Sequence, residues 1–359
     1  MYTKFSEEEM KVRYVAPGAR GRIDLPIYDG PLTARDNMKA AIFDKDPAYM
    51  PNYRYYLNFT PRIIPDNEAR GFIMDGGEPK RHPEGFEDMF GITWKFIELV
   101  GGAMVEPGEP LLEDMNEWEE KIVWPDVDSW DWEGQRKISE ELVKNEELAL
   151  VPTIMNGYFE RLISMLDFEN AAVALIDESQ QDAVHAFLDK LADLYIKIID
   201  KYLEYFPEID GFCIHDDWGS QRAPFFSLDT VMEMLVPPMK KVADHIHAKG
   251  RFYDMHCCGQ VEALIPAMIA IGVDSWSGQP MNDKAKLYHQ YGKDILIGVD
   301  TREIPADMPE EEVKQIAREF VDEFFVPGAP GMVGYNSPIQ NPLFFTYVYQ
   351  YSREKNAEK

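Results

Sequence analysis

The chain has 359 residues, of which 45% are hydrophobic, and it carries a net charge of −28. This charge opposes binding to nucleic acid or to an anionic membrane surface, and no stretch approaches the roughly 18 consecutive apolar residues of a membrane span. The N-terminal stretch has no apolar segment typical of a secretory signal, and three cysteines cannot form a disulfide framework. We therefore expect a cytoplasmic protein without nucleic-acid or membrane partners.

The first 145 residues show weak periodicity. Residues 51–59 are the best strand candidate in this part, and residues 60–145 are rich in Pro, Gly, Trp and acidic side chains. Such a composition predicts loops and short helices, which would decorate the mouth of a larger fold.

Residues 146–355 alternate short β-rich runs with helical patterns. Strands are predicted over 148–155, 210–219, 251–256, 273–276, 294–300 and 331–336. Helices are predicted from Tyr158, over 184–206, from Ser227 to Gly250 with a break at Pro237 and Pro238, over 260–271 up to Gly272, over 283–292, over 308–325, and from Pro342. In the helix at 308–325, one face would carry Val313, Ile316, Phe320 and Phe324.

This alternation predicts an α/β fold, a (β/α)₈ TIM-type barrel with an elaborated N-terminal region, as a single domain over residues 1–359. An open doubly wound sheet is the competing architecture. No Gly-x-Gly-x-x-Gly turn follows a strand to support a dinucleotide site in such a sheet.

Polar residues follow almost every predicted strand. In such barrels the C-terminal strand ends form the active site, so we expect these residues at the barrel mouth. The candidates are Asn156; His215, Asp216, Asp217 and Gln221; His256, Cys257 and Cys258; Asp274 and Gln279; Asp300; Tyr335 and Asn336. From this group we assign substrate binding to Asn156, His215, Gln221, Tyr335 and Asn336.

The densest motif is "MHCCG" at residues 255–259. Side chains alternate along a strand, so His256 and Cys258 should point to the same side and Cys257 to the other. Imidazole and thiolate are preferred zinc ligands, and a catalytic zinc site uses three protein ligands with one open position. A buried thiol pair beside a hydrogen-bonded histidine is the structural alternative at about even odds.

The sequence does not identify the third ligand of such a zinc site. Cys213 lies within a predicted strand and is better explained as a small buried hydrophobe. Asp216, Asp217 and His215 lie at the correct strand end. The two adjacent carboxylates could also act as an acid and base pair, or could cap the following helix.

These segments resemble the uroporphyrinogen decarboxylase superfamily over roughly residues 145–355. The matching stretches are "HDDWGSQ", "PPMKKVADHIHAKGRFYDMHCCGQVEALIPAMIAIGVDSW", "DILIGVDTREIPADMPEEEV" and "GMVGYNSPIQNPLFFTYVYQY". The resemblance implies a (β/α)₈ barrel. True decarboxylases of the superfamily carry an Arg-Gln-Ala-Gly-Arg motif that holds the substrate's carboxylates, and this sequence has no such motif.

The other branch of the superfamily consists of cobalamin-dependent methyltransferases, whose His-x-Cys-Gly motif is similar to His256, Cys258 and Gly259. The resemblance implies zinc at His256 and Cys258, with Asp216 or Asp217 as third ligand or general acid. The family's later cysteine is missing, because this region reads "GYNSPIQ".

Proteins of this branch that keep the His-x-Cys-Gly motif but lack the later cysteine look similar to O-demethylase-type methyltransferases. The resemblance therefore implies an enzyme that moves a methyl group between a methoxylated aromatic compound and a corrinoid protein. There, a cation or proton would stabilise the leaving aryloxide. A metal-free decarboxylase and a catalytically silent ligand-binding barrel are the alternatives.

Overall fold

The computed structural model describes residues 2–19, 21–78, 82, 84–97, 102–106, 108 and 110–356. The chain forms two compact units. We call one the terminal unit, which comprises Met1–Leu57, Glu146–Ala149 and Asp274–Lys359, and the other the central unit, which comprises Asn58–Asn145 and Leu150–Val273. The assignment of the whole chain to a single domain stays a prediction.

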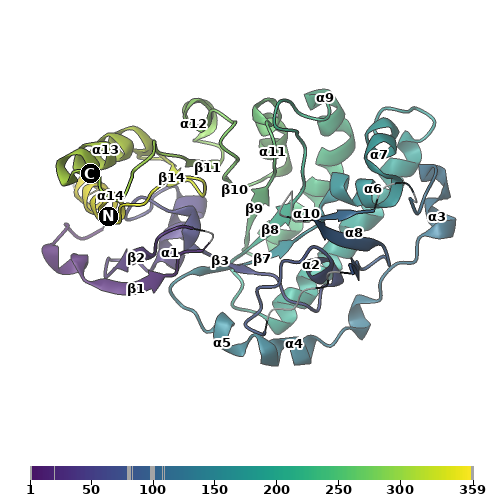
Figure 1. Cartoon of the computed structure of the whole chain (residues 1–359), viewed down its shortest axis with the longest axis horizontal. Helices are drawn as coiled ribbons and strands as arrows, with labels where there is room; N and C mark the ends of the chain where they lie inside the picture. Colours follow the sequence, from purple (N-terminus) through teal and green to yellow (C-terminus); the bar gives the residue numbers. More distant parts are fainter. Residues whose placement is uncertain are drawn as a thin grey trace. The chain divides into compact units, whose positions relative to one another are not determined.

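The central unit is built around three adjacent parallel strands (Figure 1). They are β7 (Ala149–Ile154, all but its first residue in this unit), β8 (Gly211–His215) and β9 (Phe252–His256). All five residues of β8 are buried, as expected for a parallel strand covered on both faces. The register pairs His215 with His256, so the two strands end side by side.

Helices follow each of these strands in the predicted order. They are α6 (Tyr158–Leu166), α7 (Phe168–Ala174), α8 (Gln181–Tyr205), α9 (Leu228–Thr230), η6 (Val231–Leu235), α10 (Val236–Ala248), η7 (Glu262–Leu264) and α11 (Ile265–Ile271). Ser227 caps α9 by accepting the backbone N–H of Thr230, and Gly250 and Gly272 have the left-handed φ angles of helix ends, 69° and 96°. The break predicted at Pro237 and Pro238 is found where η6 gives way to α10.

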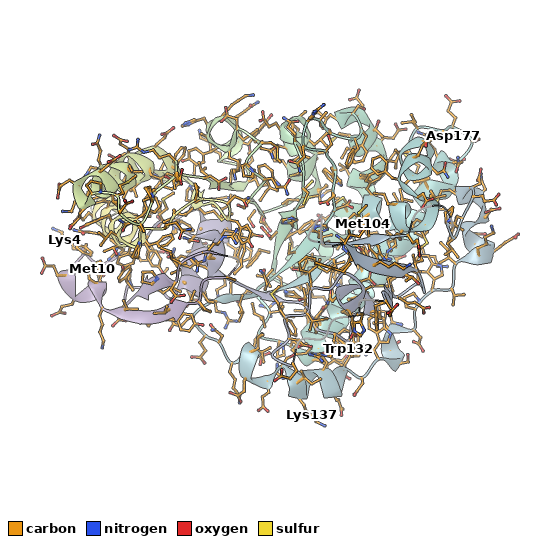
Figure 2. All side chains as sticks on the ribbon, in the orientation of Figure 1. Lys4, Met10, Met104, Trp132, Lys137 and Asp177 are labelled. Carbon is orange, nitrogen blue, oxygen red and sulfur yellow. The ribbon has the colours of Figure 1, made fainter. Side chains whose placement is uncertain are left out.

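Residues 58–145 contain the predicted short helices, namely α2 (Pro65–Ala69), η4 (Met115–Glu117), α3 (Trp118–Lys121), η5 (Val127–Ser129), α4 (Trp132–Ile138) and α5 (Glu140–Val143). They also contain an antiparallel sheet that was not predicted, formed by β4 (Phe86–Glu87), β5 (Thr93–Ile97) and β6 (Gly102–Val105). Its core is small, with Trp94 and Ala103 packed on Ala69. Figure 2 labels two contrasting side chains: Met104 of β6 is 48% exposed, whereas Trp132 of α4 is 2% exposed.

The terminal unit also alternates strands and helices. Its parallel strands β10 (Ser275–Trp276), β11 (Leu296–Val299) and β14 (Met332–Val333) are separated along the chain by α12 (Lys284–Tyr291), α13 (Glu310–Phe324) and the antiparallel pair β12 (Phe325–Val326) and β13 (Ala329–Pro330). The predicted face of α13 is buried, and Phe320 contacts Phe344 of the last helix, α14 (Leu343–Asn356), with ring centroids 5.8 Å apart.

The N-terminal part of this unit adds the antiparallel pair β1 (Val12–Ala16) and β2 (Leu25–Tyr28), followed by α1 (Ala34–Lys39). This part also contains η1 (Glu7–Met10), which precedes β1, and η2 (Ala40–Asp44) and η3 (Tyr53–Tyr55), which follow α1. The strand candidate at 51–59 is confirmed in its second half, where β3 spans Tyr56–Phe59. None of the helices in the described part of the chain is both long and apolar enough to cross a membrane.

Candidate metal centre

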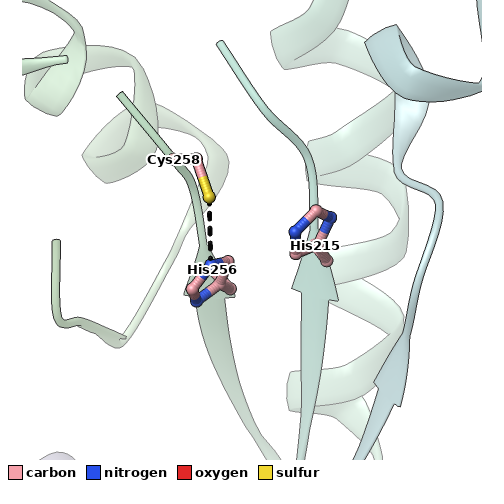
Figure 3. A group of neighbouring side chains, drawn as sticks. All are labelled: His215, His256 and Cys258. Atoms are coloured by element: carbon pink, nitrogen blue, oxygen red, sulfur yellow. Dashed lines mark hydrogen bonds between the residues drawn. The ribbon is translucent and has the colours of Figure 1, made fainter. Parts of the chain in front are cut away.

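Two histidines and a cysteine meet at the ends of β8 and β9 (Figure 3). The rings of His215 and His256 are stacked, with centroids 4.9 Å apart and planes 9° from parallel. The Sγ atom of Cys258 lies 3.4 Å from Nε2 of His256, so these two side chains face the same side, as the strand periodicity predicted.

One ligand atom from each of His215, His256 and Cys258 lies within 4.8 Å of the other two. With bond lengths of about 2.3 Å to sulfur and 2.0–2.1 Å to nitrogen, tetrahedral zinc would separate a sulfur and a nitrogen ligand by about 3.6 Å. The observed 3.4 Å between Cys258 and His256 fits this edge. His215, one of three candidates for the third ligand, is the one that joins the pair.

Glu160, in the first turn of α6, was not identified from the sequence. Its Oε2 lies 2.5 Å from Nδ1 of His215, and its Oε1 accepts a hydrogen bond of 2.8 Å from Arg70. A carboxylate at Nδ1 keeps the proton on that nitrogen and leaves Nε2 free to ligate a metal. Burial would lower the pKa of His215, but Glu160 and Asp217 together raise it well above its ordinary value.

Asp217 lies on the other side of His215, with Oδ1 3.6 Å from Nε2. The same oxygen accepts the backbone N–H of Cys258 at 2.9 Å, which fixes the turn that carries the thiol. Burial would raise the pKa of Asp217, but the imidazoles of His215 and His256 lower it below its ordinary value. Glu160, His215 and Asp217 form a second possible ligand group that shares His215 with the first.

The carboxylate of Asp216 contacts the N-terminus of α6. It accepts the backbone N–H groups of Phe159 and Glu160 at 3.1 and 2.9 Å and the indole N–H of Trp218 at 2.8 Å. Burial raises its pKa to about 6. Asp216 therefore stabilises the N-terminus of α6 and positions the turn that carries Glu160. The sequence left open a capping role toward the helix that follows Asp216, whereas α6 precedes it in the chain.

Gly259 follows the ligand cysteine because the chain passes very close to another backbone segment there. Its φ angle is +90°, and a Cβ atom on it would lie 2.0 Å from the carbonyl oxygen of Gly219. Next to it, the backbone N–H of Gln260 donates to the carbonyl of Ser220. This hydrogen bond joins the loop after β9 to the loop after β8, and Gly259 permits the close approach of the two backbones.

The other predicted site residues are distributed as follows. Asn156 is fully buried, where it accepts a hydrogen bond from Arg70 and donates one to Asp66. Gln221 is exposed on the loop after β8. Tyr335 and Asn336 belong to the terminal unit, where the backbone N–H of Tyr335 donates to Ser277 and the Asn336 amide donates to the carbonyl of Gly278.

The two other cysteines lie outside the cluster. Cys213 is 5% exposed and Cys257 is 2% exposed, and burial raises the pKa of both thiols well above the ordinary value. Cys213 is thus the buried side chain that its place within a strand predicted.

Buried charges near the cluster form a connected group. Arg161 contacts both Asp66 and Asp88, and Arg70 contacts Glu160. Glu160 in turn contacts His215, and its backbone N–H donates to Asp216. The partly exposed carboxylate of Asp217 lies on the other side of His215. Each buried carboxylate of this group thus has a cationic or hydrogen-bonding partner, as burial of charge requires.

Comparison with known proteins places the chain in a family. Parallel strands with intervening helices, and polar side chains at their C-terminal ends, define an enzyme-like α/β fold. The family model for uroporphyrinogen decarboxylase (URO-D) matches residues 142–332, and the chain belongs to this family. The match confirms the predicted α/β TIM-type barrel class.

Among solved structures, a methyltransferase from Methanosarcina mazei is similar over 90% of this chain and 99% of its own, with a TM-score of 0.58 and 14% identity. This likeness concerns the fold. A protein from Sinorhizobium meliloti 1021 is 14% identical over 63% of this chain and 83% of its own, with a TM-score of 0.28. A search of curated protein sequences found no match.

Proposed function

We propose that this protein is a methyltransferase of a corrinoid-dependent system, which moves a methyl group between a methoxylated aromatic compound and a corrinoid protein. The observation that carries the proposal is the convergence of the ligand atoms of His215, His256 and Cys258 at two neighbouring strand ends. Membership of the URO-D family and the likeness in fold to a solved methyltransferase support it.

The ligand atoms suit zinc. Two imidazoles and one thiolate are among the ligand sets that zinc prefers, and three protein ligands leave one coordination position for a substrate. Glu160 supplies the carboxylate that metal-bound histidines commonly contact through their second nitrogen.

When bound, zinc would act as a Lewis acid toward the ether oxygen that the methyl group leaves. The C–O bond would break with its electron pair on oxygen, and the reduced cobalt of a partner's corrinoid would supply the electron pair of the new bond to the methyl group. Glu160 would keep the proton on Nδ1 of His215, and Asp217 holds the backbone of Cys258 in place.

Neither adjacent aspartate is well suited to donate a proton to the leaving oxygen. Asp217 has a lowered pKa and is therefore ionised at neutral pH, and the oxygens of Asp216 already accept three hydrogen bonds. We therefore propose that the metal, rather than a carboxylic acid, stabilises the aryloxide.

The test is methyl transfer from 2-methoxyphenol to free cob(I)alamin, followed by the absorbance of methylcobalamin and by the amount of catechol released. Wild-type protein should form both products in equal amounts, and His215→Ala and Cys258→Ser should lose the activity. His245→Ala is the control, because His245 lies on α10 of the same unit and contacts Asp200 instead.

Activity that survives in Cys258→Ser would overturn the metal-dependent mechanism. Metal-independent release of CO₂ from uroporphyrinogen, with no methyl transfer, would instead favour the decarboxylase.

A further inference from the structure

Arg70, the residue directly after α2, holds one oxygen of the Glu160 carboxylate. Its Nη1 donates to Oε1 of Glu160 at 2.8 Å and to Oδ1 of Asn156 at 2.9 Å. The other oxygen of Glu160, Oε2, faces Nδ1 of His215 at 2.5 Å. Arg70 is therefore separated from a candidate metal ligand by a single carboxylate.

Arg70 is itself fixed by its surroundings. It is 7% exposed, and its guanidinium carbon lies 4.8 Å from the centroid of the Trp94 ring on β5. From there the contacts run through a closed circuit of buried side chains, in the order Arg70, Asn156, Asp66, Arg161, Asp88, Trp94 and back to Arg70. A shift of Arg70 alone would leave buried polar atoms without partners, which is costly.

The circuit leaves Arg70 with one carboxylate partner. Arg161 contacts both Asp66 and Asp88, so these two carboxylates are paired within the circuit. In the described part of the chain, the ion pair of Arg70 is with Glu160 alone. The charge-assisted hydrogen bond of Arg70 is thus directed at the carboxylate of Glu160.

The backbone of Glu160 is fixed independently of its carboxylate. Its N–H donates to Asp216 at 2.9 Å, which sets the first turn of α6. A glutamate side chain still has several rotatable torsions between this backbone and its carboxylate, and fixing them costs rotamer entropy. The carboxylate keeps its orientation because each of its oxygens has a partner, Arg70 on one side and His215 on the other.

We propose that Arg70 is a positioning residue of the candidate metal centre. It holds the carboxylate of Glu160 in the orientation that directs Nε2 of His215 toward a metal. Arg70 acts through Glu160 and needs no contact with the metal. The inference rests on the proposed function, because it requires a metal at His215, His256 and Cys258.

The inference also gives a role to the segment from α2 to β5, whose sheet has only a small core of its own. The circuit takes Arg70 from this segment, together with Asp66, Asp88 and Trp94. The segment thus reaches α6, which carries Glu160, through buried charged contacts.

The first test compares crystal structures of the metal-free wild type and of Arg70→Met. Methionine keeps much of the apolar surface of the arginine side chain but has no charge and no N–H donor. Oε2 of Glu160 should lie within hydrogen-bond distance of Nδ1 of His215 in the wild type and beyond about 3.5 Å in the variant. Arg70→Gln replaces Arg70→Met, with the same expectation, if the methionine variant does not fold.

The second test is a titration with Co²⁺, whose visible absorption reports the number and geometry of its ligands. Arg70→Met should bind Co²⁺ about tenfold more weakly than the wild type, the lower end of the effect of losing a carboxylate behind a metal-bound histidine. Arg70→Lys, which keeps the charge, should recover part of the affinity. The double variant of Arg70→Met and Glu160→Gln should bind Co²⁺ within about twofold of Glu160→Gln alone, because both changes act through one carboxylate.

Arg62→Met is the matched control. Arg62 also belongs to the central unit and makes a bidentate ion pair with a buried aspartate, Asp75, whose further contact leads to Gln135 instead of the circuit. Arg62→Met should lower the thermal stability but leave the Co²⁺ affinity and the contact between Glu160 and His215 unchanged. Thermal melts establish that each variant is folded at the temperature of the titration.

The role of Arg70 would be overturned if Arg70→Met kept the contact between Glu160 and His215, or bound Co²⁺ as tightly as the wild type. Equal weakening by Arg62→Met would also overturn it, because a general loss of stability would then explain the effect. Wild-type protein that takes up no Co²⁺ would contradict the proposed metal-dependent function together with this role. Co²⁺ binding that does not depend on Arg70 would contradict this role alone.

Discussion

Glu160→Gln separates the role of Glu160 in orienting a ligand from its role in packing. The carboxylate accepts one hydrogen bond from Arg70 and contacts His215 with its other oxygen, and its side chain is 9% exposed. A glutamine has nearly the same shape but only one acceptor oxygen, so it cannot satisfy both partners. We expect a loss of about 1–3 kcal/mol in the free energy of unfolding.

The effect on the metal should be larger than that of a general loss of stability. Removing the carboxylate behind a metal-bound histidine typically costs about 10–100-fold in affinity, which corresponds to about 1.4–2.7 kcal/mol. Zinc affinity would be measured by competition with a chromophoric chelator, at a temperature where every variant is folded. Glu160→Asp, which keeps the charge, should recover part of the affinity.

Glu208→Gln is the matched control for this experiment. Glu208 makes a bidentate ion pair with Arg136. It precedes the first residue of β8, whereas His215 is the last residue of that strand. The control should leave zinc affinity unchanged. If Glu160→Gln and Glu208→Gln both bind zinc as tightly as the wild type, Glu160 does not orient His215 for a metal.

Two further predictions concern stability. Gly259→Ala should lower the melting temperature far more than Gly250→Ala. Both glycines have a positive φ, but of the two only Gly259 would bring the new Cβ against a backbone atom, the carbonyl oxygen of Gly219 at 2.0 Å. Equal shifts of the melting temperature would contradict this. Asp75→Asn should cost about 2 kcal/mol at pH 7. Burial would raise the pKa of Asp75, but hydrogen bonds from Arg62 lower it below its ordinary value. Asp75 therefore adds to the free energy of unfolding above about pH 4, the pKa of a free Asp, and this contribution is lost as the pH falls through the lower pKa of the folded state. Denaturant titrations across this pH range should show that the free energy of unfolding falls less steeply with acid in Asp75→Asn than in the wild type. An equal pH dependence in the two proteins would contradict this role of Asp75.

The regular part of the fold could be predicted because each element carries its own local signals. The burial of Val313, Ile316, Phe320 and Phe324 follows from their spacing, and Ser227 marked a helix start. The sheet of β4, β5 and β6 could not be predicted, because its strands are short and several outward side chains, such as Phe96 and Met104, are apolar and exposed. Such strands have no clear alternation of apolar and polar residues.

The candidate site could be predicted only in part, for a related reason. His256 and Cys258 stand on one strand, so a period of two residues places them together. The contact of His215 with them depends on the register between two strands that are 41 residues apart in sequence, counted from His215 to His256. Glu160 comes from a helix whose rotation is set by tertiary contacts, among them the hydrogen bonds from its first turn to Asp216.

The proposed metal site is best examined by the zinc content per chain, measured by elemental mass spectrometry on wild-type protein and on Cys258→Ser. Both proteins would be purified without chelators, and Cys213→Ser would serve as a thiol control, since Cys213 is buried within β8. We expect close to one zinc per chain in the wild type and in Cys213→Ser, and almost none in Cys258→Ser. Wild-type protein without zinc, or zinc that remains in Cys258→Ser, would contradict it.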